Sequence, residues 1–401
     1  MPTEAVKSPA TGIAWTRGTA ATLALLLFFS TALRLACLSK PYFVDAKSHV
    51  HAIESGTLLI QPPGYFLFNL GGLLTAHLLH CTPAHALSVD NLLFGELGVL
   101  FFALLCLRRF APGHALLLAA CYAASPIVWF TADIHSTYAS VTAFAPLLFL
   151  CCEDWNMFPL GCFFWALMTG FRPSDGIFVL PWLLWQGSHR SWSTRAKAVA
   201  VATPALLVWL IPTAYKLGGW LAIVRTNQKQ AASVAQGLLS SHTSIHSTTD
   251  LIRLAAGLLL GWGLLLPVVF FALATRAKAL LPVRSALLWI APGLLFFALY
   301  YIADSVYVAY LLAAGLIAAG YLLQSRSPQR RTTLYAASIT LSVLFMLLAR
   351  PVAGGGKNNA ILNAYLFKFT RWSLEHEYAP RLATLLGACG QPDVLGTCGT
   401  N

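Results

Sequence analysis

Long apolar runs, separated by short polar segments, follow one another along almost the whole chain. A helix needs roughly 20 mostly apolar residues to cross a bilayer, and these runs lack the alternation typical of membrane β-strands. We therefore predict an all-α integral membrane protein with about eleven transmembrane helices. The predicted helices are Thr19–Cys37, Asn91–Leu107, Gly113–Phe130, Tyr138–Cys152, Phe158–Gly170, Gly176–Trp185, Ala198–Tyr215, Leu254–Ala274, Ser285–Ile302, Tyr307–Leu323 and Leu334–Ala349.

A polar loop follows the first apolar run and leads into a run that is short for a membrane span. The loop covers Pro41 to about Pro63, and the run Phe66–Leu79 is interrupted by Gly71-Gly72 and His77. We interpret Phe66–Leu79 as a re-entrant or interfacial helix. The first external loop, residues 38–90, is thus predicted to contain both an amphipathic and a re-entrant segment.

Lys and Arg residues cluster in alternate loops, which sets the predicted orientation. With a cytoplasmic N-terminus these loops face the cytoplasm, in agreement with the positive-inside rule. If Phe66–Leu79 were a full span, these basic loops would lie outside. One loop on the predicted inner side departs from the rule, because it carries the acidic pair Glu153-Asp154. The basic loops contain Arg108-Arg109, Arg190/Arg195/Lys197, Arg276/Lys278/Arg284 and Arg326/Arg330/Arg331.

This topology divides the chain into a polytopic domain, residues 1–349, and a short external tail, residues 350–401. The other external segments are the first loop, the tip around Asp133 and the polar stretch Leu217–Asp250. The tail is predicted to lie outside, which in a bacterium would be an oxidising space, so we expect Cys389 and Cys398 to form a disulfide, with Cys81 as a rival partner.

The composition agrees with a membrane protein and argues against a nucleic-acid-binding one. Hydrophobic residues make up 58% of the chain and charged residues 10%, with a mean hydropathy of +0.69. Soluble proteins carry about 25% charged residues. The net charge of +12 comes from Lys and Arg at the ends of apolar runs, not from one basic stripe. Loop charges that set the topology explain it, and binding of lipid phosphate is the alternative.

The strongest concentration of candidate chemistry lies just after the first helix. Asp45, His49 and Glu54 occur within a predicted short amphipathic helix, and the string Gln61-Pro62-Pro63-Gly64-Tyr65 follows. Asp45 is placed to act either as a functional carboxylate or as the N-cap of that helix. The prolines and glycine indicate a turn that ends one element and begins another.

The order of a transmembrane helix, Asp45, an amphipathic helix, Pro62-Pro63-Gly64-Tyr65 and an apolar helix resembles the GT-C class of glycosyltransferases. Within that class it is most similar to bacterial relatives of the protein O-mannosyltransferases and aminoarabinose transferases. Ala124-Ser125-Pro126 before Asp133, the stretch Thr169–Gly176, and Tyr301–Tyr307 resemble later external helix ends of the class. Gln61 departs from the pattern, because a basic residue often precedes the prolines there.

The resemblance implies a polyprenyl-phosphate sugar as donor and Asp45 as catalytic base. A carboxylate that takes the proton of an acceptor hydroxyl contributes typically about 10²–10⁴-fold. Arg172 is the main candidate for binding the donor phosphate, since a guanidinium can bind phosphate through two N–H groups. Lys47 and Arg225 are further candidates. Snorkelling of Arg172 or pairing with Asp175 is the structural alternative.

Other polar residues on the predicted external side are candidates for substrate binding. Asp133 and His135 could position the acceptor or bind a divalent metal, although a helix-end cap explains them equally simply. Asp304, between Tyr301 and Tyr307, could bind sugar, although tyrosines are also expected at a membrane interface. His242 and His246 have metal-ligand spacing but no third ligand nearby, so the metal requirement stays open. The complete set of predicted substrate-binding residues is His49, Glu54, Tyr65, Asp133, His135, Tyr301 and Asp304.

We therefore predict a glycosyltransferase that moves a sugar from a polyprenyl-phosphate donor to an acceptor hydroxyl on the external face of the membrane. The acceptor could be a glycan, a lipid or a protein, and neither it nor the sugar can be read from the sequence. The resemblance implies a bacterial cell (inner) membrane. The alternative function is a transporter or flippase of lipid-linked sugars or other anions. Two related halves with matching broken helices, which many transporters have, are not evident.

Overall fold

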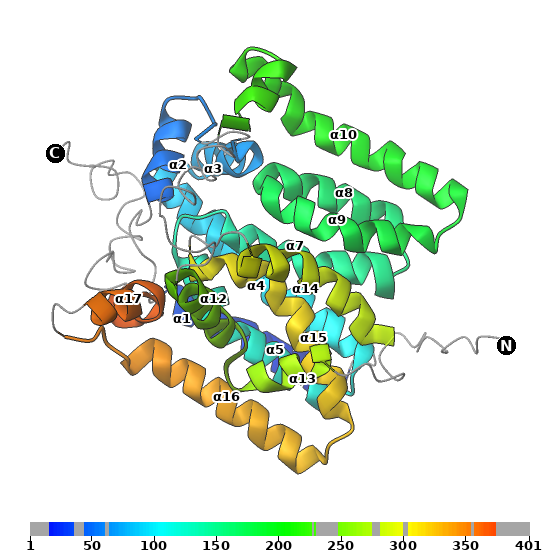
Figure 1. Ribbon diagram of the computed structural model, residues 1–401, viewed down its shortest axis with the longest axis vertical. Coiled ribbons are helices and arrows are strands. Elements are labelled where there is room, and N and C mark those ends of the chain that lie inside the picture. The colour runs from blue at the N-terminus through cyan, green and yellow to red at the C-terminus, as the bar shows by residue number, and fades with distance from the viewer. Residues whose placement is uncertain are drawn as a thin grey trace.

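The computed structural model describes residues 16–35, 44–60, 64–226, 228–229, 248–274, 281–299, 304–353 and 357–373. In these residues the regular structure is helical, as predicted (Figure 1). Pro62, Pro63, Gln61, Tyr301, His242, His246, Cys389 and Cys398 lie outside the described residues. The predicted disulfide between the last two therefore stays a prediction.

Among the described residues, six helices are long and apolar enough to cross a membrane, and a bent pair of helices would be a seventh. The pair is α5 (Pro112–Ala123) and α6 (Pro126–Asp133), bent by 53° where Pro126 cannot continue the hydrogen bonding of α5. The described helices thus support a multi-pass membrane protein with six or seven candidate spans, whereas about eleven spans remain a prediction. The six are α1 (Arg17–Leu35), α4 (Pro83–Arg109), α10 (Trp192–Leu217), Leu251–Phe271, Ser305–Gln324 and α16 (Pro328–Leu348).

The remaining predicted spans coincide with shorter or interrupted helices, and two of the six candidate spans themselves contain a 3₁₀ segment. The predicted helix Leu254–Ala274 is broken by the 3₁₀ turn η2 at Gly263–Leu265, where Gly263 has a φ of +51°. The helices concerned are α7 (Tyr138–Phe149) with the π-helical turn η1 (Leu150–Asp154), α8 (Phe158–Phe171), α9 (Pro173–Ser188), α12 (Thr248–Trp262), α13 (Leu266–Ala274), α14 (Leu281–Leu299), and η3 (Ser305–Leu311) with α15 (Leu312–Gln324).

The first external loop contains two short helices that pack on each other and on the start of α4. These are α2 (Val44–Glu54) and α3 (Phe66–Leu79), and α3 has the bounds predicted for the short apolar run. A Cβ atom at Gly72 of α3 would lie 2.7 Å from both Ile53 and Leu87. The missing side chain of Gly72 therefore allows α2, α3 and α4 to approach closely.

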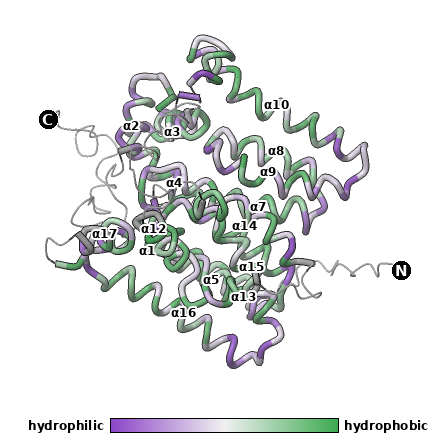
Figure 2. The backbone as a smooth tube through the Cα atoms, viewed as in Figure 1, coloured by the Kyte–Doolittle hydropathy of each residue, from purple (hydrophilic) through white to green (hydrophobic). Residues whose placement is uncertain are grey.

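Large apolar side chains face outward on the peripheral helices, as expected for a protein surrounded by lipid. Figure 2 shows apolar stretches along α10 and α16, which lie at the edges of the bundle. Phe28 and Phe29 of α1, Val208 of α10 and Leu341 of α16 are each more than half exposed. A soluble protein exposes few such residues in one contiguous patch.

The acidic pair Glu153-Asp154, which lies in a loop predicted to be cytoplasmic, forms ion pairs with a basic residue. Arg109, at the end of α4, contacts Asp154 at 2.5 Å and Glu153 at 2.8 Å. Glu153 also accepts hydrogen bonds from Gln186 and Ser285. The two carboxylates thus share one end of the bundle with Arg109, whose charge they compensate.

Candidate active site

Arg172 lies at the junction of two helices, between α8 and α9. Pro173 occupies the first turn of α9, and proline both removes a backbone donor and favours a helix start. The Arg172-Pro173 pair therefore ends one helix and begins the next. Only 7% of Arg172 is exposed, so the chain places a cation inside the protein at this junction.

The Arg172 guanidinium is held by two hydrogen bonds and two tyrosine rings. Its Nε donates to Oδ1 of Asp175 at 3.1 Å, and Nη1 donates to Oγ1 of Thr137 at 3.3 Å. Its Cζ lies 3.9 Å from the ring centroid of Tyr138 and 5.1 Å from that of Tyr307. Each cation–π contact is worth about 0.5–2 kcal/mol. The guanidinium has five N–H donors, and those left over have no partner among the described residues, so they can bind an anion.

Asp45 lies in the first turn of α2, near Arg172. Residues 36–43 lie outside the described residues, so the N-cap alternative for Asp45 stays a prediction. Burial raises the pKa of the partly buried Asp45 carboxyl, while the positive charge of Arg172 acts in the opposite direction. Asp45 is therefore a carboxylate with increased proton affinity that interacts electrostatically with the buried cation.

His49 lies one helical turn after Asp45 and is held in its neutral form. Its Nδ1 is 2.6 Å from Oδ1 of Asn69, and Nδ2 of Asn69 donates to the carbonyl of Leu58 at 3.0 Å. The amide oxygen of Asn69 thus faces the ring, and Nδ1–H of His49 donates to it. Burial lowers the pKa of His49 to about 4. Near neutral pH the His49 ring is therefore neutral.

Tyr65 connects the first external loop to the same site. It precedes α3 with a φ of +51°, directly after Gly64, whose φ is +101°. Burial raises the pKa of Tyr65, and the charges of Arg172 and Asp45 both act on its hydroxyl. The Tyr65 ring lies 5.7 Å from that of His49. The described part of the predicted turn therefore reaches the candidate site.

Asp133 and His135, the second predicted polar pair, contact different residues. Nε2 of His135 lies 2.7 Å from Oγ of Ser88, and His135 and His49 interact electrostatically. Asp133 is instead influenced by Arg34 and Glu96, which form an ion pair between α1 and α4. His135 therefore belongs to the surroundings of His49, and Asp133 to a neighbouring buried ion pair.

Asp304 has two partners that fix it at the start of η3. Its Oδ1 accepts the N–H of Val306 at 3.0 Å, and its Oδ2 pairs with Nζ of Lys368. Of the two tyrosines predicted beside it, Tyr307 contacts Arg172. Tyr301 lies outside the described residues. A sugar-binding role of Asp304 stays a prediction.

The remaining predicted residues are at the surface. Lys47 and Glu54 of α2 are exposed, and so is Arg225 in the helical segment 220–226. Nζ of Lys216, at the end of α10, donates to the carbonyl of Gly56 at 2.8 Å and so joins α10 to the end of α2. The roles of Lys47, Glu54 and Arg225 in donor or acceptor binding stay predictions.

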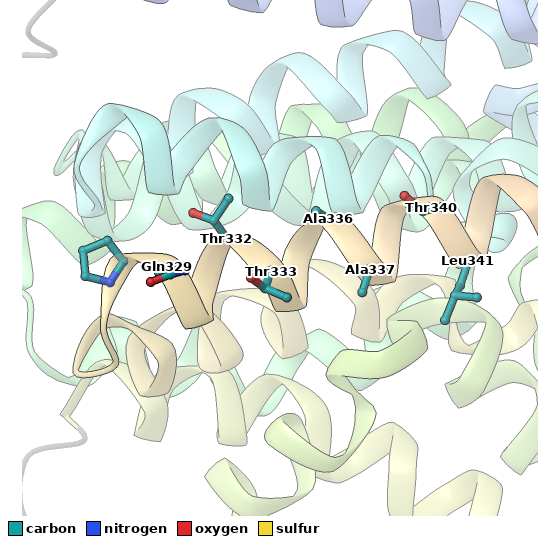
Figure 3. A pocket seen from close by; sticks show the side chains of 8 residues that line it. Gln329, Thr332, Thr333, Ala336, Ala337, Thr340 and Leu341 are labelled. Atoms are coloured by element: carbon teal, nitrogen blue, oxygen red, sulfur yellow. The ribbon is translucent and has the colours of Figure 1, made fainter.

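Within the described residues no group of three His, Cys, Asp or Glu residues could hold a metal ion. The pocket in Figure 3 runs along α16 and does not include the residues around Arg172. Its lining consists of Pro328, Gln329, Thr332, Thr333, Ala336, Ala337, Thr340 and Leu341.

Several residues of the site were not predicted from the sequence. Tyr138 was included only in an apolar run, and Thr137 and Lys368 had no pattern to distinguish them. Asn69 had a usable signal, because it is an amide within the apolar run Phe66–Leu79 and buried polar groups require partners.

No protein-family model and no curated protein matches this chain. Two crystal structures of ArnT from Cupriavidus metallidurans are similar to it. The structure bound to undecaprenyl phosphate has a TM-score of 0.60 and 17% identity, and the match covers 86% of this chain and 68% of that chain. The structure in the apo state has a TM-score of 0.55 and 17% identity, covering 79% and 62%. The predicted resemblance to GT-C aminoarabinose transferases is therefore confirmed for the fold.

Proposed function

We propose that the chain is a glycosyltransferase that transfers a sugar from a polyprenyl-phosphate donor to an acceptor hydroxyl. The observation that carries the proposal is the buried Arg172, which retains N–H donors for an anion and lies near the Asp45 carboxylate. The fold shared with an ArnT that was crystallised with undecaprenyl phosphate supports the choice of donor. We further propose that the protein has about eleven spans, lies in a bacterial inner membrane and carries this site on the external face.

In the proposed reaction Asp45 accepts the proton of the acceptor hydroxyl. The acceptor oxygen forms a bond to the anomeric carbon of the sugar, and the bond from that carbon to the phosphate oxygen breaks. The electron pair of the broken bond stays on the lipid phosphate, where Arg172 stabilises the negative charge. Burial of Arg172 strengthens this interaction, because the surroundings screen charge less than water does.

The test is transfer from radiolabelled polyprenyl-phosphate sugars by the purified protein in detergent, with and without EDTA. We expect Asp45→Asn to lower turnover by about 10²–10⁴-fold, the usual contribution of a general base. The matched control is Asp90→Asn, because Asp90 is another partly buried carboxylate in the same region, bonded to Thr75 at 2.7 Å. Asp90→Asn should retain turnover.

Full activity of Asp45→Asn would disprove the role of Asp45. Absence of turnover with any donor, together with saturable donor binding that does not depend on Asp45, would favour the transporter. Loss of turnover in EDTA that added divalent metal restores would show that a metal takes part.

A further inference from the structure

The segment of the tail at residues 357–373, here called the tail segment, folds back onto the helical bundle. It contains α17 (Lys357–Tyr365) and the 3₁₀ turn η4 (Phe367–Phe369). Phe369 is fully buried, and its ring centroid lies 4.5 Å from that of Phe130 in α6. Burial of an aromatic side chain stabilises the packing of the segment that carries it. The tail segment is thus packed into the body of the protein.

Tyr365 joins the tail segment to two other elements. Its carbonyl accepts a hydrogen bond from Oγ of Ser305, the first residue of η3, at 3.0 Å. Its hydroxyl accepts one from Nη2 of Arg253 in α12 at 2.5 Å, and the Arg253 Cζ lies 4.6 Å from its ring centroid. The tail segment therefore contacts the beginning of η3 directly.

The ion pair of Lys368 with Asp304 is the second connection to η3. Lys368 is only 7% exposed, and burial lowers its pKa while the Asp304 carboxylate acts in the opposite direction. A buried ammonium group is very costly unless it is paired. Since Asp304 also accepts the N–H of Val306, the same carboxylate both pairs with the tail segment and orders the first turn of η3.

The turn that Asp304 orders carries Tyr307. The backbone N–H of Tyr307 donates to the carbonyl of Asp304 at 3.1 Å. The ring of Tyr307 lies 5.5 Å from that of Tyr138, and both rings contact the Arg172 guanidinium. A continuous set of contacts therefore leads from Lys368 through Asp304 and Tyr307 to Arg172.

We propose that Lys368 is a positioning residue for the donor phosphate: through Asp304 it holds Tyr307 where that ring orients Arg172. This inference rests on the proposed function. It predicts that removing the ion pair weakens donor binding, while the chemistry of a donor that is already bound changes little. A purely structural role would lower stability without a selective change in donor KM.

The test measures binding of undecaprenyl phosphate to the full-length protein by native mass spectrometry, together with donor KM and kcat. We expect Lys368→Met to weaken binding about tenfold and to raise KM with little change in kcat, a size typical of coupled contacting residues. Asp304→Asn should act alike, because the amide oxygen can still cap η3 but the charge is lost. The double variant should be no weaker than either single variant, and Lys368→Arg should retain binding.

A matched control is Asp154→Asn, which weakens an ion pair at the other end of the bundle. If it weakens lipid binding as much as Lys368→Met does, the effect is general destabilisation and the inference is wrong. Unchanged binding in Asp304→Asn would also overturn it, even where Lys368→Met fails to fold. If undecaprenyl phosphate binds to the wild type and to the variants equally well, this inference is wrong and the proposed function is unaffected. If the wild type neither binds undecaprenyl phosphate nor transfers sugar, the proposed function fails, and this inference with it.

Discussion

Replacing Arg172 by methionine should destabilise the protein, and the structure indicates by how much. The change leaves the carboxylate of Asp175, whose side chain is 6% exposed, without its ionic partner. Breaking a buried pair from one side costs about 3–5 kcal/mol. The cation–π contacts with Tyr138 and Tyr307 add about 1 kcal/mol or more. We expect Arg172→Met to lower the free energy of unfolding by about 4–6 kcal/mol.

A second substitution separates this stability effect from the proposed role in binding. Arg172→Met/Asp175→Asn also removes the unpaired carboxylate, so most of the lost stability should return. The double variant still lacks the cation, so binding of undecaprenyl phosphate should stay lost. Both quantities can be measured in detergent. Tryptophan fluorescence gives the unfolding midpoint at one fixed scan rate, and native mass spectrometry gives the bound lipid.

Three results would refute this reasoning. A wild-type unfolding midpoint for Arg172→Met would show that the ion pair carries no net stability. A double variant no more stable than Arg172→Met would show that the loss does not come from the unpaired Asp175. Wild-type lipid binding by the double variant would show that Arg172 does not hold the phosphate.

Two further predictions concern pH. The pKa of His49 is about 4 in the folded protein, whereas a histidine in an unfolded chain has a pKa near 6.5. Because the unfolded state therefore binds the proton first as pH falls, the free energy of unfolding should decrease by about 3 kcal/mol between pH 6.5 and pH 4. His49→Gln should flatten this part of the profile of unfolding midpoint against pH, and an unchanged slope would disprove the assignment. The positive charge of Arg172 lowers the pKa of Asp45, and a phosphate bound to Arg172 offsets that charge. The ascending limb of kcat, which reports the donor-bound enzyme, should therefore lie at higher pH than that of kcat/KM for the donor, which reports the enzyme without phosphate. Coincident limbs would show that Arg172 does not act on Asp45.

The positions of the helices could be predicted from the sequence, because apolar runs and polar breaks are local signals. The bounds of α3 agree with the predicted run Phe66–Leu79. The interruptions were harder to predict. Pro126 bends α5 and α6 by 53°, and Gly263 begins a 3₁₀ turn, both inside runs whose hydropathy is continuous. Hydropathy reports the surrounding solvent, whereas these breaks depend on backbone geometry and on neighbouring helices.

The candidate site could be predicted only in part, for a related physical reason. Asp45 and Arg172 were identifiable because a charge near membrane depth is costly and requires an explanation. Tyr138, Tyr307 and Lys368 contribute through contacts between segments far apart in the chain. A single sequence shows the period of a helix but not which helix faces it, so these partners emerged only from the packing.

Two buried arginines, Arg109 and Arg172, differ in how far the surrounding residues compensate their charge. Arg109 faces two carboxylates, Glu153 and Asp154, so its charge is more than compensated. Among the described residues Arg172 forms a salt bridge only with Asp175, and two neutral tyrosine rings and a threonine hydroxyl complete its surroundings. Uncharged rings stabilise a cation without neutralising it. Pairing with Asp175 alone therefore does not explain Arg172, because its surroundings leave positive charge and N–H donors that an anionic ligand can use.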